Sequence, residues 1–389
     1  MRYEHRRFWI LVIIVSISGF SQGMLLPLIS VIFEGDGVSS TLNGLNATGL
    51  YIGTLLISPF IEQPLRKYGY KPVIITGGAL VFIALSMFPL WKTALFWFIL
   101  RLIIGIGDHG LHFATQTWIT STSPVNKLGR NMSIYGISFG IGFAVGPLFV
   151  PLVKVSESLP FIISSVLCLL AWALVFLVKN EKPEALVGNA NQGGFIRYKL
   201  AFKYAWIAFL PPFIYGFLES SLNALFPVYA LRQLFDVEVI SAMLAAFSVG
   251  AIITQLPIGV LGDKIGRQKV IGYGLLLGSI FFAIGNYLET AQSLLVAVFL
   301  FAGMSVGSMF SLGITYMTDL TPKELLPTGN LLCGIFFSLG SLSGPFIGGL
   351  YLEKFPSEGF LLMIATVLLV VCVFVLSIKN KQNKIENEG

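Results

Sequence analysis

The chain has 389 residues, of which 55% are hydrophobic and only 11% are charged. A soluble domain carries roughly 25% charged residues, so this chain has too few charges to cover the surface of a soluble enzyme. Its 33 Phe and 41 Gly, spread along the sequence, also exclude a fibrous repeat and a disordered polar chain.

Twelve long apolar runs follow one another, and a bilayer-spanning helix needs about 20 such residues. In chain order the predicted spans are residues 8–31, 42–61, 72–91, 94–119, 132–153, 160–178, 204–230, 241–260, 270–288, 293–316, 328–351 and 360–378. Several contain Gly and Pro, which neighbouring helices tolerate inside a membrane. The first run is too long for a signal-peptide core and is expected to remain as a helix. The sequence therefore predicts an all-α integral membrane protein.

The loops between successive predicted spans are alternately rich and poor in Lys and Arg. With the N-terminus in the cytoplasm, 20 of the 25 Lys and Arg lie on that side, four lie outside, and Arg101 is left within a span. The positive-inside rule then predicts both termini on the cytoplasmic side of the plasma membrane. The net charge of +6 is explained by this orientation in a lipid bilayer, so no nucleic-acid partner is expected.

The two halves of the chain repeat at a spacing of 198 residues. TWITSTSP at Thr117–Pro124 matches TYMTDLTP at Thr315–Pro322, and Pro59 matches Pro257. An ordered series of matches at one spacing indicates a duplicated six-helix unit. The longest polar stretch divides the spans six and six. The predicted organisation is an N-terminal bundle, a cytoplasmic connecting loop and a C-terminal bundle with a short tail, over residues 1–180, 181–203 and 204–389.

The connection after the eighth span reads GVLGDKIGRQK, from Gly259 to Lys269. It resembles the G-x-L-x-D-[RK]-x-G-[RK]-x-[RK] loop of the major facilitator superfamily, a family of secondary transporters. The resemblance implies a cytoplasmic gate, in which the Asp caps a neighbouring helix N-terminus and the basic residues pair with acidic groups. The residues that match the gate motif are Gly259, Asp263, Lys264, Gly266, Arg267 and Lys269.

The first half carries an altered copy of this loop. EQPLRKYGYK, at residues 62–71, keeps Gly69 but has Arg66 where the motif has Asp. Glu62, one helical turn earlier, is a candidate substitute for the missing carboxylate. The altered copy leaves open whether this half of the gate latches.

Two further elements resemble the family. RLIIGIG, from Arg101 to Gly107, is similar to its R-x-x-x-G-x-G element, and GFAVGP is similar to a G-x-x-x-G-P motif typical of antiporters. Small residues four apart also allow close helix packing, so two packing kinks are the alternative interpretation. The residues concerned in the two halves are Gly142, Gly146, Pro147, Gly340, Gly344 and Pro345.

Ionisable residues at bilayer depth are costly and are functional candidates. Arg101, Asp108, His112 and Gln116 share one face of the fourth predicted helix, with His109 beside it, and that face is expected to border a water-filled cavity. In the superfamily the first, fourth, seventh and tenth helices line the central cavity. The further polar candidates on these helices are Gln22, Glu219 and Asn223.

Desolvation penalises a charged carboxyl, which can then load and release a proton near neutral pH. Glu219 has no positive partner in its own helix and is the first candidate for a titrating site; the alternative is a neutral acid that ties helices together. Asp108 is either part of a proton relay with His112 or a structural ion pair with Arg101. In a transporter Arg101 would orient the site or an anionic group.

The histidines of DHGLH, Asp108–His112, lack a third ligand nearby, so no metal site is expected. No catalytic triad, phosphate loop or dinucleotide fingerprint is present, so neither an enzyme nor a cofactor is predicted. The sequence favours a functional monomer that exports a small organic, amphipathic compound in exchange for protons. Proton symport or facilitated uptake of a metabolite is the second hypothesis. A transport-inactive membrane sensor or partner-binding protein is the third.

Overall fold

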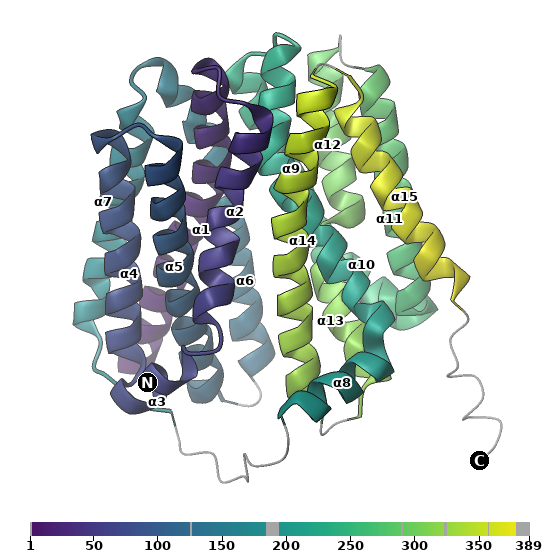
Figure 1. Cartoon of the computed structure of the whole chain (residues 1–389). Coiled ribbons are helices and arrows are strands. Elements are labelled where there is room, and N and C mark those ends of the chain that lie inside the picture. The colour runs from purple at the N-terminus through teal and green to yellow at the C-terminus, as the bar shows by residue number, and fades with distance from the viewer. Residues whose placement is uncertain are drawn as a thin grey trace, which may run out of the picture.

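The computed structural model describes residues 2–124, 127–183, 194–288, 291–322, 325–356 and 358–378. Two bundles of helices stand side by side, and the chain passes up and down between two ends of the molecule (Figure 1). We call the end with the N-terminus, α3 and α8 the lower end, and the opposite one the upper end. Among the described residues, α1 begins at the lower end and α15, the last helix, runs back toward it.

The N-terminal bundle comprises α1 (Arg2–Gly35), α2 (Ser40–Ile57), α3 (Glu62–Tyr68), α4 (Tyr70–Met87), η1 (Phe88–Leu90), α5 (Ala94–Thr122), α6 (Leu128–Val145), η3 (Gly146–Lys154), α7 (Ser158–Ala173) and η4 (Leu174–Leu177). The C-terminal bundle comprises α8 (Gly194–Ala205), η5 (Trp206–Phe209), α9 (Leu210–Arg232), α10 (Val237–Ile265), α11 (Arg267–Tyr287), α12 (Gln292–Val306), α13 (Met309–Leu320), α14 (Leu326–Lys354) and α15 (Phe360–Ser377).

Within the described residues, eleven helical segments are long and apolar enough to cross a membrane. The bent pair α2 and α3, which meet at 57°, makes a twelfth if it is counted as one span. This confirms the predicted all-α membrane architecture. The second span differs in detail, because the helix ends at Ile57 and the chain then turns into α3.

The helix after the connecting segment was not predicted. Residues 194–203, which the sequence places in the loop, belong to α8, and residues 184–193 lie outside the described part of the chain. The tenth span is also divided, because α12 ends at Val306 and α13 begins at Met309. A Cβ at Gly307, inside this break, would lie 2.1 Å from the Cβ of Ala251 on α10, so the break lies where two helices almost touch.

The glycines of the repeated kink motif lie at close helix crossings. A Cβ at Gly142 would lie 1.9 Å from the carbonyl oxygen of Ser16, and a Cβ at Gly340 would lie 1.9 Å from that of Phe213. Real Cβ contacts are not this short, so only glycine allows α6 to pack on α1 and α14 to pack on α9. The geometry is the same in the two halves, and it fits the packing interpretation of the motif.

Candidate substrate cavity and proton site

The two bundles are joined at their upper end by an ion pair. Arg232 at the end of α9 donates from Nε to Glu34 Oε1 at 2.7 Å and from Nη2 to Glu34 Oε2 at 3.1 Å. The same guanidinium donates to Ser40 Oγ at 2.8 Å and to the carbonyl oxygen of Leu352 at 3.2 Å. Glu34 and Arg232 are 198 residues apart, so they occupy equivalent positions in the two repeats. Both side chains are about four-fifths buried.

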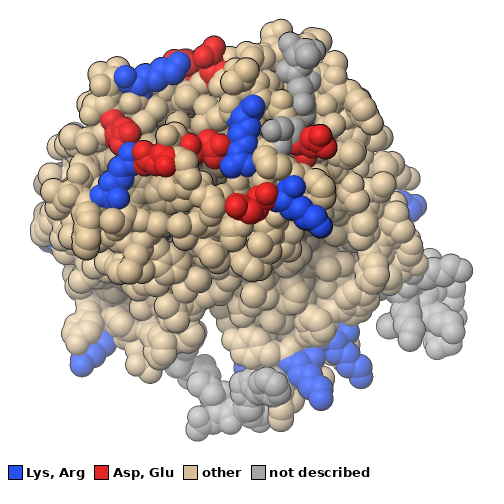
Figure 2. Space-filling model, turned by 45° about the horizontal axis from the view of Figure 1, so that its top comes forward, with Lys and Arg blue, Asp and Glu red and all other residues tan. Residues whose placement is uncertain are grey.

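Other contacts between the bundles lie in the same upper half. Lys154 pairs with Glu238 at 2.6 Å in an exposed ion pair, and Ser30 donates to the carbonyl of Ala224 in the interior. Figure 2 shows acidic and basic side chains gathered on this upper face. A Cβ at Gly44 of α2 would lie 2.1 Å from the carbonyl oxygen of Pro345 on α14, so the two backbones meet closely there. The structure therefore represents a state whose bundles are held together at the upper end.

The gate motif at the lower end makes contacts within the C-terminal bundle. Arg267 donates to Asp263 at 2.8 Å, pairs with Asp319 of α13 at 2.7 Å and donates to the carbonyl of Thr315. The hydrogen bond that the structure gives Asp263 comes from Arg267. The cap on a neighbouring helix stays a prediction, whereas Arg267 pairs with acidic groups as the resemblance implies.

The altered loop of the first half forms a similar turn. Gly69 and Gly266 have the same φ of +94°, a region that favours glycine, so the turn is repeated although its charges are not. Glu62 pairs with Arg66 inside α3, on a surface where both side chains are exposed. Glu62 therefore neutralises the substituted Arg66, and neither side chain joins α3 to another helix through a described contact.

Glu181 was missed by sequence reasoning. It follows the sixth span and was assigned to the connecting loop, but its carboxylate pairs with Arg7 of α1 and accepts a hydrogen bond from Trp118 Nε1 of α5 at 2.8 Å. The Arg7 guanidinium also lies over the Trp118 ring, 5.6 Å from its centroid. This carboxylate ties α1 to α5 at the lower end of the N-terminal bundle.

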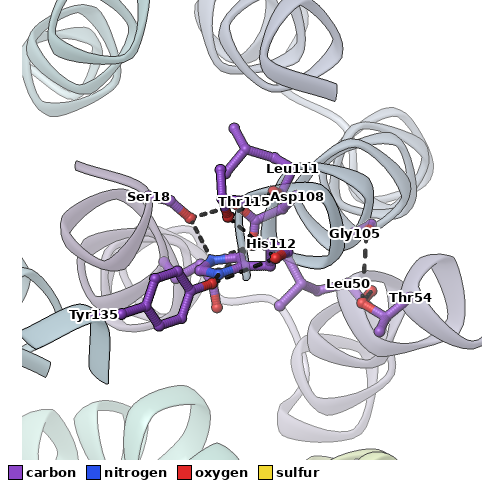
Figure 3. Close-up of polar contacts among 10 residues, drawn as sticks. Ser18, Leu50, Thr54, Gly105, Asp108, Leu111, His112, Thr115 and Tyr135 are labelled. Carbon is purple, nitrogen blue, oxygen red and sulfur yellow. Dashed lines mark hydrogen bonds and ion pairs between the residues drawn. The ribbon is translucent and has the colours of Figure 1, made fainter. Parts of the chain in front are cut away.

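Asp108 lies at the centre of a hydrogen-bond network between α1, α5 and α6 (Figure 3). Ser18 donates to Asp108 Oδ1 at 2.5 Å, and Gln22 Nε2 donates to Oδ2. Ser18 Oγ also lies 2.9 Å from His112 Nε2, and His112 Nδ1 lies 2.8 Å from the hydroxyl of Tyr135. Two donors on one carboxyl group are the pattern expected of an ionised carboxylate.

The exposure of the predicted polar face changes along α5. Gln116 is exposed and His112 is partly exposed, whereas Asp108 is 7% exposed and Arg101 is fully buried. Only the lower part of this face is therefore accessible in this state. His109 lies beside it, and its Nε2 is 3.1 Å from Ser58 Oγ of α2.

Arg101 does not pair with Asp108. Its three guanidinium nitrogens have no hydrogen-bond partner among the described residues. A separation of seven positions along α5 places Arg101 and Asp108 on one face but about 10 Å apart along the helix axis. The proposed structural ion pair is therefore absent. The phenol of Tyr51 on α2 is the neighbouring titratable group with which this guanidinium interacts electrostatically.

Glu219 lies in the middle of α9 and is half-buried. No described residue donates a hydrogen bond to its carboxyl or pairs with it. Asn223 donates instead to the backbone carbonyl of Glu219, at 2.8 Å. Tyr215 and Tyr51 interact electrostatically with the Glu219 carboxyl, and Tyr51 also with Arg101. Tyr51, which carried no signal in the sequence, is thus an electrostatic neighbour of both Glu219 and Arg101.

A metal centre has no support in the described part of the chain, where no three His, Cys, Asp or Glu side chains come together. The free cysteines Cys168, Cys333 and Cys372 are buried on separate helices. The site is thus a set of polar side chains on α1, α2, α5, α6 and α9. Its accessible part, which we call the opening, is on the lower side, where His112 is partly exposed and Gln116 is exposed.

The sequence profile of the Major Facilitator Superfamily matches residues 11–237 and again residues 209–389. The chain belongs to this superfamily. It is a secondary transporter, not an enzyme, and a multi-pass membrane protein. The second match covers the C-terminal bundle from α9 onward, whereas the first covers the N-terminal bundle and extends through α9, so the two overlap over residues 209–237.

Similar proteins cover nearly the full length of the chain. An uncharacterized MFS-type transporter of Bacillus subtilis, YfkF, is 53% identical over 93% of this chain and 92% of its own. Multidrug resistance protein 1 of the same organism is 26% identical over 85% and 86% of the two chains. The crystal structure of the nucleoside transporter NupG has a TM-score of 0.79 and 15% identity, over 95% of this chain and 98% of that one. At 15% identity, the similarity to NupG concerns the fold alone.

Proposed function

We propose that the protein exports a small organic, amphipathic compound in exchange for protons across the plasma membrane. Both termini would then lie in the cytoplasm, and the lower end would be the cytoplasmic end. The structure would represent a state closed toward the outside. The placement of 20 of the 25 basic residues supports this orientation.

One observation carries the proposal: each bundle holds a carboxyl group near the middle of a long helix, Asp108 on α5 and Glu219 on α9. Asp108 accepts two hydrogen bonds, whereas Glu219 is half-buried with no described polar partner. Ionisable groups at this depth are costly and mark ion or substrate pathways. A carboxyl without polar partners suits reversible protonation, and binding a lipophilic cation to Glu219 would compete with a proton for the same group. The exchange of the two would couple their movements.

The similarity to a multidrug resistance protein supports export, although it is distant. Aromatic side chains near Glu219, namely Tyr215 and Tyr51, suit a lipophilic cargo, because substrate sites combine apolar walls with few polar groups. Arg101 fits the role of orienting the site, since its guanidinium is buried near Tyr51 and is not engaged by a described acid.

The proposal is tested with the reconstituted full-length chain. Three probes of different class are compared: ethidium as a lipophilic cation, uridine as a nucleoside and xylose as a sugar. A compound that binds the folded state raises the melting temperature in proportion to its occupancy, so thermal shift first ranks the probes. Proton movement is then followed by a dye inside the vesicles when the bound probe is added.

Export predicts that ethidium drives protons in the opposite direction, and that Glu219→Gln abolishes this movement. The exposed Glu358 supplies the matched control, because Glu358→Gln should leave the flux unchanged. Protons that move with uridine or xylose would indicate symport instead. Binding with no transport of any probe would indicate a sensor. Either of these two outcomes, symport or binding alone, would contradict the proposal.

A further inference from the structure

We propose that Tyr135, His112 and Ser18 form a proton route that leads from the lower opening to the Asp108 carboxylate. The inference rests on the proposed function in one respect, which is that Asp108 takes up a proton. The sequence offered no signal for Ser18 or Tyr135. The network places them on either side of the imidazole, one on α1 and one on α6 (Figure 3).

Ser18 is necessary for this route because the imidazole does not reach the carboxylate directly. His112 Nε2 lies 3.7 Å from Asp108 Oδ2, which is beyond hydrogen-bond distance. Ser18 Oγ lies 2.9 Å from the same nitrogen and 2.5 Å from Asp108 Oδ1. The hydroxyl therefore bridges the gap between the two titratable groups.

All the donors in this series of hydrogen bonds point toward Asp108. Ser18 has a single O–H, and because it donates to Asp108, its oxygen accepts from His112 Nε2–H. A neutral imidazole with its proton on Nε2 accepts at Nδ1, where the Tyr135 hydroxyl donates at 2.8 Å. The same hydroxyl also lies 3.5 Å from the carbonyl oxygen of His112, which is the longer of its two contacts. The hydrogen bonds thus run from Tyr135 through His112 and Ser18 to Asp108 without a break.

A proton would cross this series of hydrogen bonds by a relay, in which each new O–H or N–H bond forms as another one breaks. A hydronium ion at the opening gives a proton to the Tyr135 oxygen and becomes water, as the original Tyr135 proton passes to His112 Nδ1. The Nε2 proton then passes to Ser18 Oγ, and the Ser18 proton passes to Asp108 Oδ1. The result is a neutral Asp108, a neutral imidazole with its proton on Nδ1, and unchanged tyrosine and serine hydroxyls.

The opening is on the side of the network from which the proton enters the route. The side chain of His112 is 22% exposed, and Gln116, one turn lower on α5, is exposed, whereas Tyr135 is 8% exposed and borders the opening only beside His112. Asp108 is reached from this side through the network, since its own side chain is 10% exposed. A second carboxylate oxygen, held by Gln22, keeps Asp108 oriented while the first exchanges its proton.

Few other titratable groups border this network in the described residues. His109 lies on the same helix as His112, and Cys168 lies on α7. Helix α1 contributes the uncharged Ser18 and Gln22. Helix α4 contributes Ile74, Gly78 and Val81, none of which titrates. His109 is turned toward Ser58 of α2 instead of Ser18, so it does not offer a parallel route.

The test follows protonation of Asp108 directly and needs no substrate. The full chain in lipid is taken by stopped flow from alkaline to mildly acidic pH. The infrared carbonyl band of a protonated carboxylic acid is then recorded. The band of Asp108 is the one that Asp108→Asn removes and Glu219→Gln keeps.

The variants remove one link at a time. Ser18→Ala breaks the bridge, and Tyr135→Phe removes the donor to Nδ1, so we expect each to slow appearance of the band on the order of 100-fold or more. Ser18→Thr keeps a hydroxyl and should restore much of the rate. The matched controls are Ser21→Ala, one turn along α1 and facing Cys168, and Tyr70→Phe, whose hydroxyl contacts Ser121. Both should behave like the wild-type chain.

Unchanged rates in Ser18→Ala and Tyr135→Phe would overturn the route, even if transport proves to be proton-coupled. The absence of any Asp108 band in the wild-type chain would also overturn it. A band with the expected variant pattern supports the route, and it does so even if no probe moves protons in vesicles. The proposed function and the route therefore fail by different measurements.

Discussion

Replacing Glu34 with Gln should shift the protein away from the state closed at its upper end. The wild-type carboxylate accepts two hydrogen bonds from Arg232, and the two side chains are only 18% and 21% exposed. Hydrogen bonds to charged groups contribute about 1.5–3 kcal/mol. Arg232 keeps Ser40 and the Leu352 carbonyl as acceptors, so the loss is at the lower end of this range. We expect a cost of about 1–2 kcal/mol, which changes the ratio of the two states by about 5–30-fold.

Pulsed electron resonance between two spin labels measures this shift. Leu90 in the N-terminal bundle and Tyr287 in the C-terminal bundle are 74% and 79% exposed near the upper end, and Cys at both positions carries the labels. The three native cysteines are buried and should not react under mild conditions. Glu34→Gln should add a population at longer distances, and exchanging the charges of Glu34 and Arg232 should partly reverse it.

The pair Lys154–Glu238 is the matched control. It also joins the two bundles at the upper end, but its side chains are 49% and 54% exposed. Exposed ion pairs contribute about 0–1 kcal/mol, so Glu238→Gln should change the distances far less. The reasoning is refuted if Glu34→Gln leaves the distances unchanged, or if the two variants have equal effects.

Three further predictions concern packing and charge. Gly44→Leu should hold the upper end open in the same distance measurement, because a Cβ there meets the Pro345 carbonyl oxygen at 2.1 Å. Gly142→Leu should lower the melting temperature, since a Cβ there would lie 1.9 Å from the carbonyl oxygen of Ser16; Gly136→Leu, with nothing within 4 Å, should not. Desolvation lowers the pKa of Lys92, but hydrogen bonds to Asp36 and Glu157 outweigh it and raise the pKa overall. The stability that Lys92 adds should therefore be fully present below the pKa that Lys92 has in the unfolded chain, and it should be lost as pH rises through the pKa that Lys92 has in the folded protein. The melting temperatures of Lys92→Met and of the wild type should therefore converge at alkaline pH.

The repeat in the sequence predicted much of the fold. Gly142 and Gly340 share a spacing of 198 residues, and the structure gives both the same contact with a neighbouring backbone. The division of α12 from α13 was not predictable, because the break depends on how closely Gly307 approaches α10. Periodicity records which residues are apolar, whereas a break depends on the shape of the neighbouring helix.

The candidate site was predicted only in part. Asp108 and His112 stand out because charge is rare in an apolar span. Ser18 and Tyr135 are ordinary residues there, and they acquire a role only through α1 and α6, whose register the sequence does not specify. The alternative in which Arg101 pairs with Asp108 was wrong, because two residues on one face of a helix can still lie too far apart along its axis to touch.

Glu34 and Arg232 were missed for a related reason. Each lies at the end of its helix, where a charge is normal, and neither is conspicuous alone. Their pairing follows from the pseudo-symmetry, which brings equivalent positions of the two repeats together at the seam. A search for opposite charges at the repeat spacing would have found them.

Uphill accumulation of ethidium in vesicles tests the central claim most directly. Equal ethidium is placed on both sides of the membrane, and a pH gradient is imposed as the only driving force. Proton-coupled exchange through the two carboxyl groups predicts that the wild-type chain concentrates ethidium on the acidic side, and that Asp108→Asn and Glu219→Gln each abolish this while the proteins stay folded. Accumulation that survives in both variants, or the absence of accumulation in a wild-type chain that equilibrates ethidium, would contradict it.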